Sequence, residues 1–152
     1  GIGSAGSTVL RATTFRTFRC LGYRFATVIH PTAIIASDVT IDEGVQVMAG
    51  AIVQTGARVG MNSIINTRAS IDHDCVIGTD VHLAPAVTLS GGVTVGNGVH
   101  IGTAATVIQG IDIGHDSIIG AGSVVLRDVG AGVTVFGVPA RQAPVTVSSC
   151  SG

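Results

Sequence analysis

A histidine between two aspartates is the part of this chain best suited to move a proton. The run is Asp72-His73-Asp74, and Cys75 follows it. A carboxylate beside an imidazole favours the imidazolium that forms when the histidine takes up a proton, so it increases the basicity of the ring. His73 and Asp74 are therefore a candidate general base and its partner. A solvated polar corner has the same local pattern, and the spacing alone does not separate these two interpretations.

Composition excludes several other kinds of chemistry and partner. The 152 residues carry a net charge of −1 and no basic cluster, so nucleic acid and anionic membranes are poor candidate partners. All eight basic residues are arginine, and without lysine the chain has neither Schiff-base chemistry nor a Walker phosphate loop. The three cysteines, Cys20, Cys75 and Cys150, are odd in number and widely spaced, unlike a disulfide framework. No signal peptide is recognisable, so we expect the protein in the cytoplasm.

A six-residue repeat must position the candidate residues. Every sixth residue from Ile35 to Val125 is Val, Ile or Leu, sixteen times in succession, and a series of mostly small residues lies two places earlier. Offsets of two put both series on one face of a short strand. Glycine often follows the large series, as at Gly78, where we expect its backbone freedom to turn a corner. A period of six does not follow a 3.6-residue helical turn, and it predicts a parallel β-helix.

The hexapeptide pattern resembles that of the left-handed β-helix transferases. The resemblance implies three hexads in each triangular coil, so that residues eighteen apart stack along the axis. Such proteins are usually trimers with active sites between neighbouring prisms. In this arrangement Cys75 belongs to the small inward series and is a packing residue rather than a nucleophile. His73 and Asp74 lie at a corner, and Gly91 stacks one coil along from His73.

The two ends of the chain depart from the repeat. Residues 8–20 predict an amphipathic helix with Gly22 at its end, and residues 23–29 predict a strand. The glycines of residues 1–6 match G-x-G-x-x-G, but no strand precedes them, so we interpret this segment as a plain loop. Residues 129–142 are expected to close the end of the β-helix, because its last strands need a cap.

Four segments carry a resemblance to one family. They are Val28-Ile29-His30-Pro31-Thr32-Ala33, Ile64-Ile65-Asn66-Thr67, Ile71-Asp72-His73-Asp74-Cys75-Val76-Ile77-Gly78 and Gly120-Ala121-Gly122-Ser123-Val124-Val125. They look like the bacterial sugar O- and N-acetyltransferases, a group that includes sialic acid O-acetyltransferases and UDP-4-amino-sugar N-acetyltransferases. The resemblance covers residues 20–142. Because hexads alone indicate only a fold, the Asp-His-Asp-Cys run in phase with them is the specific signal.

The resemblance implies a role for six residues. His73 matches the catalytic base of the family, and Asp74 matches its acidic neighbour, which is Glu in some members. The residues that match positions at the CoA cleft are His82, Gly91, Thr103 and Ala121. Of these, His82 matches a histidine that contacts acetyl-CoA and Gly91 matches a glycine at the same cleft. The other two match positions whose backbone groups contact the pantetheine arm.

The implied function is transfer of an acyl group from an acyl-CoA, with acetyl-CoA as the expected donor, to an amino or hydroxyl group of a bacterial sugar or nucleotide sugar. A homotrimer is expected, and no metal. Family members carry an N-terminal α/β domain that binds the nucleotide sugar. We therefore interpret residues 1–30 as a remnant of that domain, residues 31–128 as the β-helix acyltransferase domain, and residues 129–152 as a C-terminal cap and tail.

Three alternatives remain. A γ-class carbonic anhydrase needs three convergent histidines, and the histidine intervals here do not match that family. An acyl-carrier-protein-dependent UDP-sugar acyltransferase shares a similar His-Asp-Cys segment, but that family has a sizeable helical C-terminal domain. A non-catalytic β-helix assembly module stays open because the N-terminal part is short.

The resemblance assigns no role to several other histidines and arginines. His100 stacks on His82 in the eighteen-residue scheme, and we favour a structural or interface role for it. Arg127 and Arg141 have the geometry to meet CoA phosphates, although exposed arginines are commonly solvated. No role is assigned to His30 or His115.

Overall fold

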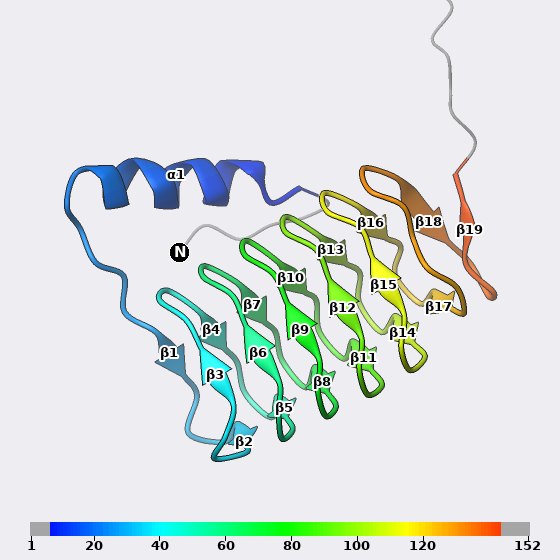
Figure 1. The fold of residues 1–152 in the computed structure, drawn as a ribbon, viewed down its shortest axis with the longest axis horizontal. Coiled ribbons are helices and arrows are strands. Elements are labelled where there is room, and N and C mark those ends of the chain that lie inside the picture. The colour runs from blue at the N-terminus through cyan, green and yellow to red at the C-terminus, as the bar shows by residue number, and fades with distance from the viewer. Residues whose placement is uncertain (1–6, 144–152) are drawn as a thin grey trace, which may run out of the picture.

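The computed structural model describes residues 7–143, whose strands wind into a triangular prism with one helix along its side (Figure 1). Each full coil contributes one short strand to each of three parallel sheets, here called faces A, B and C. The fold is a left-handed parallel β-helix, as the hexapeptide pattern and its resemblance predicted.

Nearly all strands are two residues long. Face A contains β1 (Val28–Ile29), β4 (Gln46–Val47), β7 (Ile64–Ile65), β10 (His82–Leu83), β13 (His100–Ile101), β16 (Ile118–Ile119), β18 (Thr134–Phe136) and β19 (Arg141–Gln142). Face B contains β2 (Ile34–Ile35), β5 (Ile52–Val53), β8 (Ser70–Ile71), β11 (Thr88–Leu89), β14 (Thr106–Val107) and β17 (Val124–Val125). Face C contains β3 (Thr40–Ile41), β6 (Arg58–Val59), β9 (Val76–Ile77), β12 (Thr94–Val95) and β15 (Asp112–Ile113). The chain visits the faces in the order A, B, C, which creates an AB, a BC and a CA corner.

Strands of successive coils pair in parallel with an offset of eighteen residues. On face A, for example, His82 pairs with His100, and on face B Leu89 pairs with Val107. Three hexads therefore make one coil, as the resemblance implied. Because paired strands lie about 4.8 Å apart, residues eighteen apart are separated by about that distance along the prism axis.

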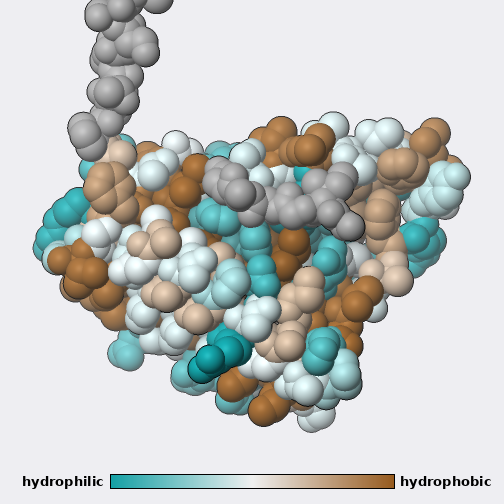
Figure 2. Space-filling model, turned by 180° about the vertical axis from the view of Figure 1, so that it is seen from behind, coloured by the Kyte–Doolittle hydropathy of each residue, from teal (hydrophilic) through white to brown (hydrophobic). Residues whose placement is uncertain are grey.

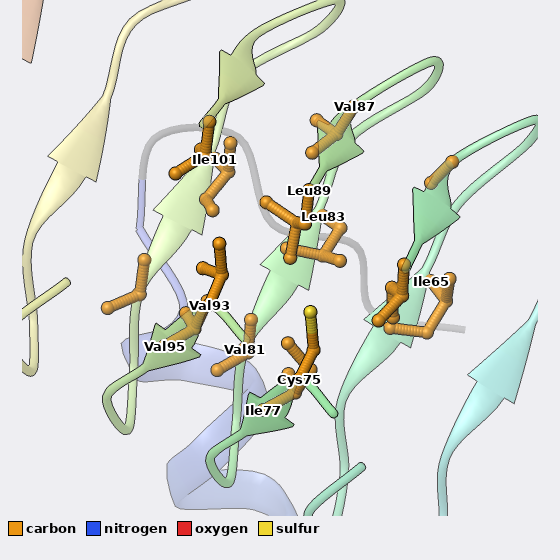
Figure 3. Close-up of a cluster of buried hydrophobic side chains, with 14 of the residues drawn as sticks. Ile65, Cys75, Ile77, Val81, Leu83, Val87, Leu89, Val93, Val95 and Ile101 are labelled. Atoms are coloured by element: carbon orange, nitrogen blue, oxygen red, sulfur yellow. The ribbon is translucent and has the colours of Figure 1, made fainter. Parts of the chain in front are cut away.

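The large and small series of the repeat fill the interior of the prism. Leu83 and Leu89 of the large series and Cys75 of the small series are completely buried (Figure 3). The Sγ of Cys75 lies 3.2 Å from the carbonyl oxygen of Ser90, and burial raises the pKa of its thiol. A buried thiol with a raised pKa is a poor nucleophile, so the structure agrees with the packing role predicted for Cys75.

One residue in each hexad turns its corner in the left-handed backbone region. These residues recur every six positions from Gly44 to Gly122, and Asp74 (φ 58°) is one of them. The expectation that the glycines after the large series turn the corners is wrong, because Gly78 does not have a positive φ. A Cβ on Gly78 would lie 2.8 Å from the amide nitrogen of Asn97, so the close approach of the next coil requires glycine there.

Helix α1 (Val9–Cys20) lies along the CA corner and is fixed there by a buried arginine (Figure 1). The Nη2 of Arg11 donates to the carbonyl oxygens of Asp80 (2.9 Å) and Val81 (3.3 Å), and Arg11 is only 4% exposed. The carboxylate of Asp80 accepts hydrogen bonds from Arg16 at 3.0 Å and from Asn62 at 2.6 Å. The helix is therefore joined to the prism by a network of charged hydrogen bonds.

The N-terminal predictions are confirmed in part. The helix expected over residues 8–20 is α1, and Gly22 (φ 87°) ends it, with the amide of Tyr23 donating to the carbonyl of Phe18 at 3.1 Å. The strand expected over residues 23–29 is shorter, because only Val28–Ile29 pairs with a neighbouring strand, β4. The G-x-G-x-x-G segment lies outside the described residues. Within residues 7–143 no helix is long and apolar enough to cross a bilayer.

The last coil departs from the six-residue period. Val129 pairs with Ile113, sixteen residues earlier rather than eighteen, so the final BC corner is two residues shorter. Strands β18 and β19 then form an antiparallel hairpin, and the amide of Ala140 donates to the carbonyl of Val124 at 2.8 Å. Apolar side chains are exposed near both ends of the prism, among them Ile34 in the first coil and Val138 in the hairpin. Figure 2 shows hydrophobic surface at both ends in one view of the molecule.

The docking of α1 leads to a stability prediction. We expect Arg11→Met to lower the free energy of unfolding by about 2–3 kcal/mol, because two buried carbonyl oxygens lose charged hydrogen bonds. Urea unfolding followed by circular dichroism measures this change. Arg24→Met is the matched control, since the Arg24 side chain is 88% exposed and contributes a surface ion pair with Glu43. Equal losses in the two variants would contradict the anchoring role of Arg11.

Candidate active site

The structure brings the imidazole of His73 and the carboxylate of Asp74 together at the BC corner, between β8 and β9. The Nδ1 of His73 lies 2.9 Å from Oδ2 of Asp74, and the backbone amide of His73 donates to Oδ1 of Asp72 at 2.8 Å. The His73 side chain is 58% exposed, so the ring remains accessible to a reactant. With Nδ1 held by the carboxylate, Nε2 is the ring nitrogen that can accept a proton.

The charges around His73 make it a stronger base. The hydrogen bond from Asp74 raises the pKa of His73 above its ordinary value, and the negative charges of Asp72 and Asp74 act in the same direction. Partial desolvation opposes them without reversing the direction. The proton-transfer chemistry that the sequence suggested is therefore supported by both the geometry and the electrostatics of this corner.

Gly91 provides the space for the His73 ring. The amide of Gly92 donates to the carbonyl of His73 at 2.8 Å, which sets Gly91 against the imidazole in the next coil. A Cβ on Gly91 would lie 2.6 Å from Cε1 and 3.0 Å from Cδ2 of that ring, and it would come closest to Nε2. Any side chain at this position would therefore displace the His73 ring. The predicted stacking of these two residues is confirmed, while the cofactor contact of Gly91 stays a prediction.

The other predicted CoA-binding residues lie on face A and at the AB corner. A groove of about 410 Å³ is lined there by His82, Pro85, Thr103 and Ala121, among others. His82 is 7% exposed, and its Nε2 lies 3.2 Å from Nδ2 of Asn66. Pro85, Thr103 and Ala121 are eighteen residues apart, so they stack along the axis and form one wall of an elongated groove.

His100 lies beside His82 in the same groove. The two rings meet edge to face, with centroids 5.1 Å apart and planes at 75°. Burial lowers the pKa of His100, and the charge of Arg11 lowers it further. Its Nδ1 is buried and has no hydrogen-bond partner among residues 7–143. A neutral, partly buried ring of this kind suits the structural role that the sequence favoured for His100.

The two groups of predicted site residues do not meet within one chain. His73 lies at the BC corner, whereas His82, nine residues later, lies in β10 on face A. Nine residues are half a coil, and face A is the side of a triangular prism opposite the BC corner. The groove next to His82 is lined by neither His73 nor Gly91. One chain thus presents the two groups of candidate residues on opposite sides.

A second histidine–aspartate pair, which the sequence analysis missed, lies at the CA corner. The Nδ1 of His115 is 3.0 Å from Oδ2 of Asp116, and Asp116 has the same left-handed backbone as Asp74. The signal was present in the sequence, because His115-Asp116 occupies the same place in its hexad as His73-Asp74. The amide of Gly132 donates to the carbonyl of His115, so Ala131 takes the place that glycine takes beside His73.

The histidines do not form a metal site in the described part of the chain. Within residues 7–143 no three His, Cys, Asp or Glu side chains lie close enough together to hold a metal ion. His73, His82 and His115 belong to the BC corner, face A and the CA corner, respectively. This arrangement gives no support to the carbonic anhydrase alternative.

Comparison with solved structures links this geometry to known enzymes. The GDP-perosamine N-acetyl transferase from Caulobacter crescentus is 42% identical, with a TM-score of 0.89 over 92% of this chain and 67% of that one. The acetyltransferase domain of PglB from Neisseria gonorrhoeae is 35% identical, with a TM-score of 0.89 over 91% of this chain and 68% of that one. WeeI from Acinetobacter baumannii is 30% identical, with a TM-score of 0.87 and the same coverage. No protein-family model matches the sequence.

The β-helix and its histidine-bearing corner define an acyltransferase of the hexapeptide-repeat class. At this identity and coverage, the chain belongs to the family of hexapeptide-repeat sugar acetyltransferases, which confirms the resemblance found in the sequence. It spans about two-thirds of the length of these relatives.

The charges at the BC corner lead to a prediction about the pKa of His73. We expect Asp74→Asn to lower the pKa of His73, because the hydrogen bond to Asp74 is the largest cause of its raised value. Asp72→Asn should lower it less, since Asp72 acts on the ring only through its charge. Titration of the imidazole Cε1 proton by NMR measures both changes. A His73 pKa that responds more to Asp72→Asn than to Asp74→Asn would contradict this account.

Proposed function

We propose that this chain transfers the acetyl group of acetyl-CoA to an amino or hydroxyl group of a sugar or nucleotide sugar, with His73 as the general base. The main support for the proposal is the environment of the His73 ring. Its Nδ1 is held by Asp74, its pKa is raised, and its Nε2 lies against a glycine that leaves the surrounding space open. A base prepared in this way suits removal of a proton from an attacking amine or alcohol.

The reaction needs no covalent enzyme intermediate. The nitrogen or oxygen of the acceptor forms a bond to the thioester carbonyl carbon while its proton moves to Nε2 of His73. The tetrahedral intermediate then collapses, the carbon–sulfur bond breaks, and the CoA thiolate takes the proton back from the imidazolium. Asp74 stabilises that imidazolium while it exists. Cys75 is buried beside this corner and takes no part.

Two comparisons support the nature of the donor and the acceptor. The Caulobacter enzyme has been solved with CoA and GDP-perosamine, and the PglB domain has been solved with acetyl coenzyme A. The elongated groove lined by His82, Thr103 and Ala121 suits an extended arm such as pantetheine. We therefore assign the donor to that groove and a nucleotide-linked amino sugar to the acceptor side of His73.

The complete site requires a second copy of the chain. His73 and Gly91 lie at the BC corner, opposite the groove on face A, so the two halves of one prism cannot act on the same acetyl group. A ring of three prisms with parallel axes brings the BC corner of each chain beside face A of the next. The proposed enzyme is thus a homotrimer with three sites, each shared by two chains.

The role of His73 is tested by a matched pair of substitutions. His73→Ala should lower kcat for thiol release from acetyl-CoA by about 10²–10⁴-fold, the range for loss of a general base. His115→Ala removes the geometrically equivalent pair at the CA corner and should leave kcat unchanged. Activity is measured as free CoA thiol across a panel of amino sugars and nucleotide sugars. Full turnover by His73→Ala, or equal losses in the two variants, would exclude this mechanism.

The shared site is tested by complementation. His73→Ala damages the BC corner, and Thr103→Trp fills the groove at the AB corner, so each variant alone should be inactive. When the two are unfolded together and refolded as mixed trimers, some sites combine an intact corner with an intact groove. Part of the wild-type activity should then return, and light scattering should give the mass of a trimer. Mixed trimers without any activity would show that each site lies within one chain.

A further inference from the structure

A carboxylate is held in a fixed orientation on the same BC corner as His73, toward the N-terminal end of the prism. Oδ2 of Asp38 accepts hydrogen bonds from Oγ1 of Thr55 at 2.7 Å and from the backbone amide of Gly56 at 3.0 Å. The amide of Asp74 donates to the carbonyl of Thr55 at 3.0 Å, which places Thr55 in the coil directly before His73. The Asp38 carboxylate therefore lies about one coil from the candidate base.

The other oxygen of this carboxylate faces no competing partner. Thr55 and Gly56 both donate to Oδ2, and Oδ1 of Asp38 accepts no hydrogen bond from another residue within 7–143. Asp38 is exposed and forms no ion pair with the residues described. The hydrogen bond from Thr55 lowers the pKa of Asp38, desolvation opposes it, and the amide of Gly56 lowers the pKa further. At neutral pH Oδ1 is thus a charged hydrogen-bond acceptor, roughly twice as strong as a neutral one.

The corner itself needs an acceptor but not a charge. At Gly56 the carboxylate of Asp38 receives the amide hydrogen bond that joins two coils. At the first AB corner the hydroxyl of Thr32 does the same for the amide of Gly50 at 3.1 Å. In later coils a backbone carbonyl is enough, as for the amide of Asp74. The charge of Asp38 is therefore not explained by folding of the corner alone.

Under the proposed function, the acceptor approaches His73 from the side on which Asp38 lies. The donor groove is lined by residues that come after His73 along the axis: Pro85, Thr103 and Ala121. The N-terminal side is thus left to the acceptor. Nε2 of His73 lies against Gly91 of the next coil, so it is separated from the Asp38 carboxylate by one to two coils, about 5–10 Å. A single sugar ring with its hydroxyl groups spans such a distance.

We propose that Asp38 determines acceptor specificity by accepting a hydrogen bond from a hydroxyl group of the sugar whose amine or hydroxyl reacts at Nε2 of His73. The inference rests on the proposed acetyl-transfer function and adds one contact to its acceptor side. The bound hydroxyl lies across the ring from the reacting atom, so the contact orients the ring. Like charges in close proximity are costly, so Asp38 also selects against sugar rings that carry a carboxylate, such as uronic and sialic acids.

The test uses a substitution that keeps the corner intact. Asp38→Asn retains an oxygen for Thr55 and Gly56 but loses the charge. It should raise KM for the acceptor about tenfold, the difference between a charged and a neutral hydrogen bond, and leave kcat and KM for acetyl-CoA unchanged. The acceptors are D-glucosamine, 4-amino-4,6-dideoxy-D-glucose and their UDP-linked forms. Asp42→Asn removes an exposed carboxylate from the CA corner and is the matched control.

Two kinds of acceptor analogue identify the contact. Among the monodeoxy analogues of these sugars, the one that lacks the bound hydroxyl should raise KM about tenfold in the wild type and less in Asp38→Asn. The uronic acid of D-glucosamine carries a carboxylate in place of the hydroxymethyl group. Its KM should fall in Asp38→Asn, because a repulsive charge has been removed.

The pKa of His73 separates a sugar contact from a disturbed base. The charged groups that raise this pKa are Asp74 and Asp72, so Asp38→Asn should leave it unchanged in an NMR titration. A shifted pKa together with a lower kcat would assign Asp38 to the base and overturn the proposal. An unchanged acceptor KM in Asp38→Asn, or an equal rise in Asp42→Asn, would also overturn it. So would equal penalties for every deoxy analogue in wild type and variant.

Equilibrium binding distinguishes this inference from the proposed function. If the wild-type protein acetylates no sugar, the proposed function fails, but calorimetric titration of the CoA-saturated protein with the same sugars still tests Asp38. Binding about tenfold weaker in Asp38→Asn than in the wild type and in Asp42→Asn would then support the sugar contact. Equal affinities, or no binding to any of the three proteins, would reject it.

Discussion

The parallel hydrogen bonds between successive coils are the interaction on which the rest of this molecule depends. From β1 to β17 they fix an offset of eighteen residues on all three faces, so a side chain at one corner lies beside the residue one coil later. Because successive side chains of a strand point to opposite faces, a slip of one position would turn the buried Val, Ile and Leu residues outward. The same bonds that close the core therefore also set Gly91 against His73.

The local conformation of a corner readily produces a histidine–aspartate pair. At Asp74 and at Asp116 the left-handed backbone lets a carboxylate meet the imidazole of the preceding residue, and the two pairs are nearly identical. What differs is the next coil, which offers a glycine beside His73 and Ala131 beside His115. The hydrogen bond to Asp74 and the charge of Asp72 raise the pKa of His73, and access to its Nε2 depends on the neighbour along the axis.

The prism also separates the parts of the site. Half a coil divides His73 from the groove beside His82, so the two groups of candidate residues in one chain face away from each other. Under the proposed function, assembly of several chains becomes part of the chemistry, because a neighbouring chain brings its groove to His73.

The sequence by itself determined the period, the β-helix, the burial of Cys75, the helix before the first coil and the placing of His73 and Asp74 at a corner. These follow from local spacing, because each hexad repeats the same two inward positions. Tertiary structure decided the rest. Distances between coils decide whether Gly78 turns a corner or permits a close approach of the backbone. They also decide which residue faces His115. The last coil is shortened by two residues where Val129 pairs with Ile113, and the six-residue repeat does not predict this change.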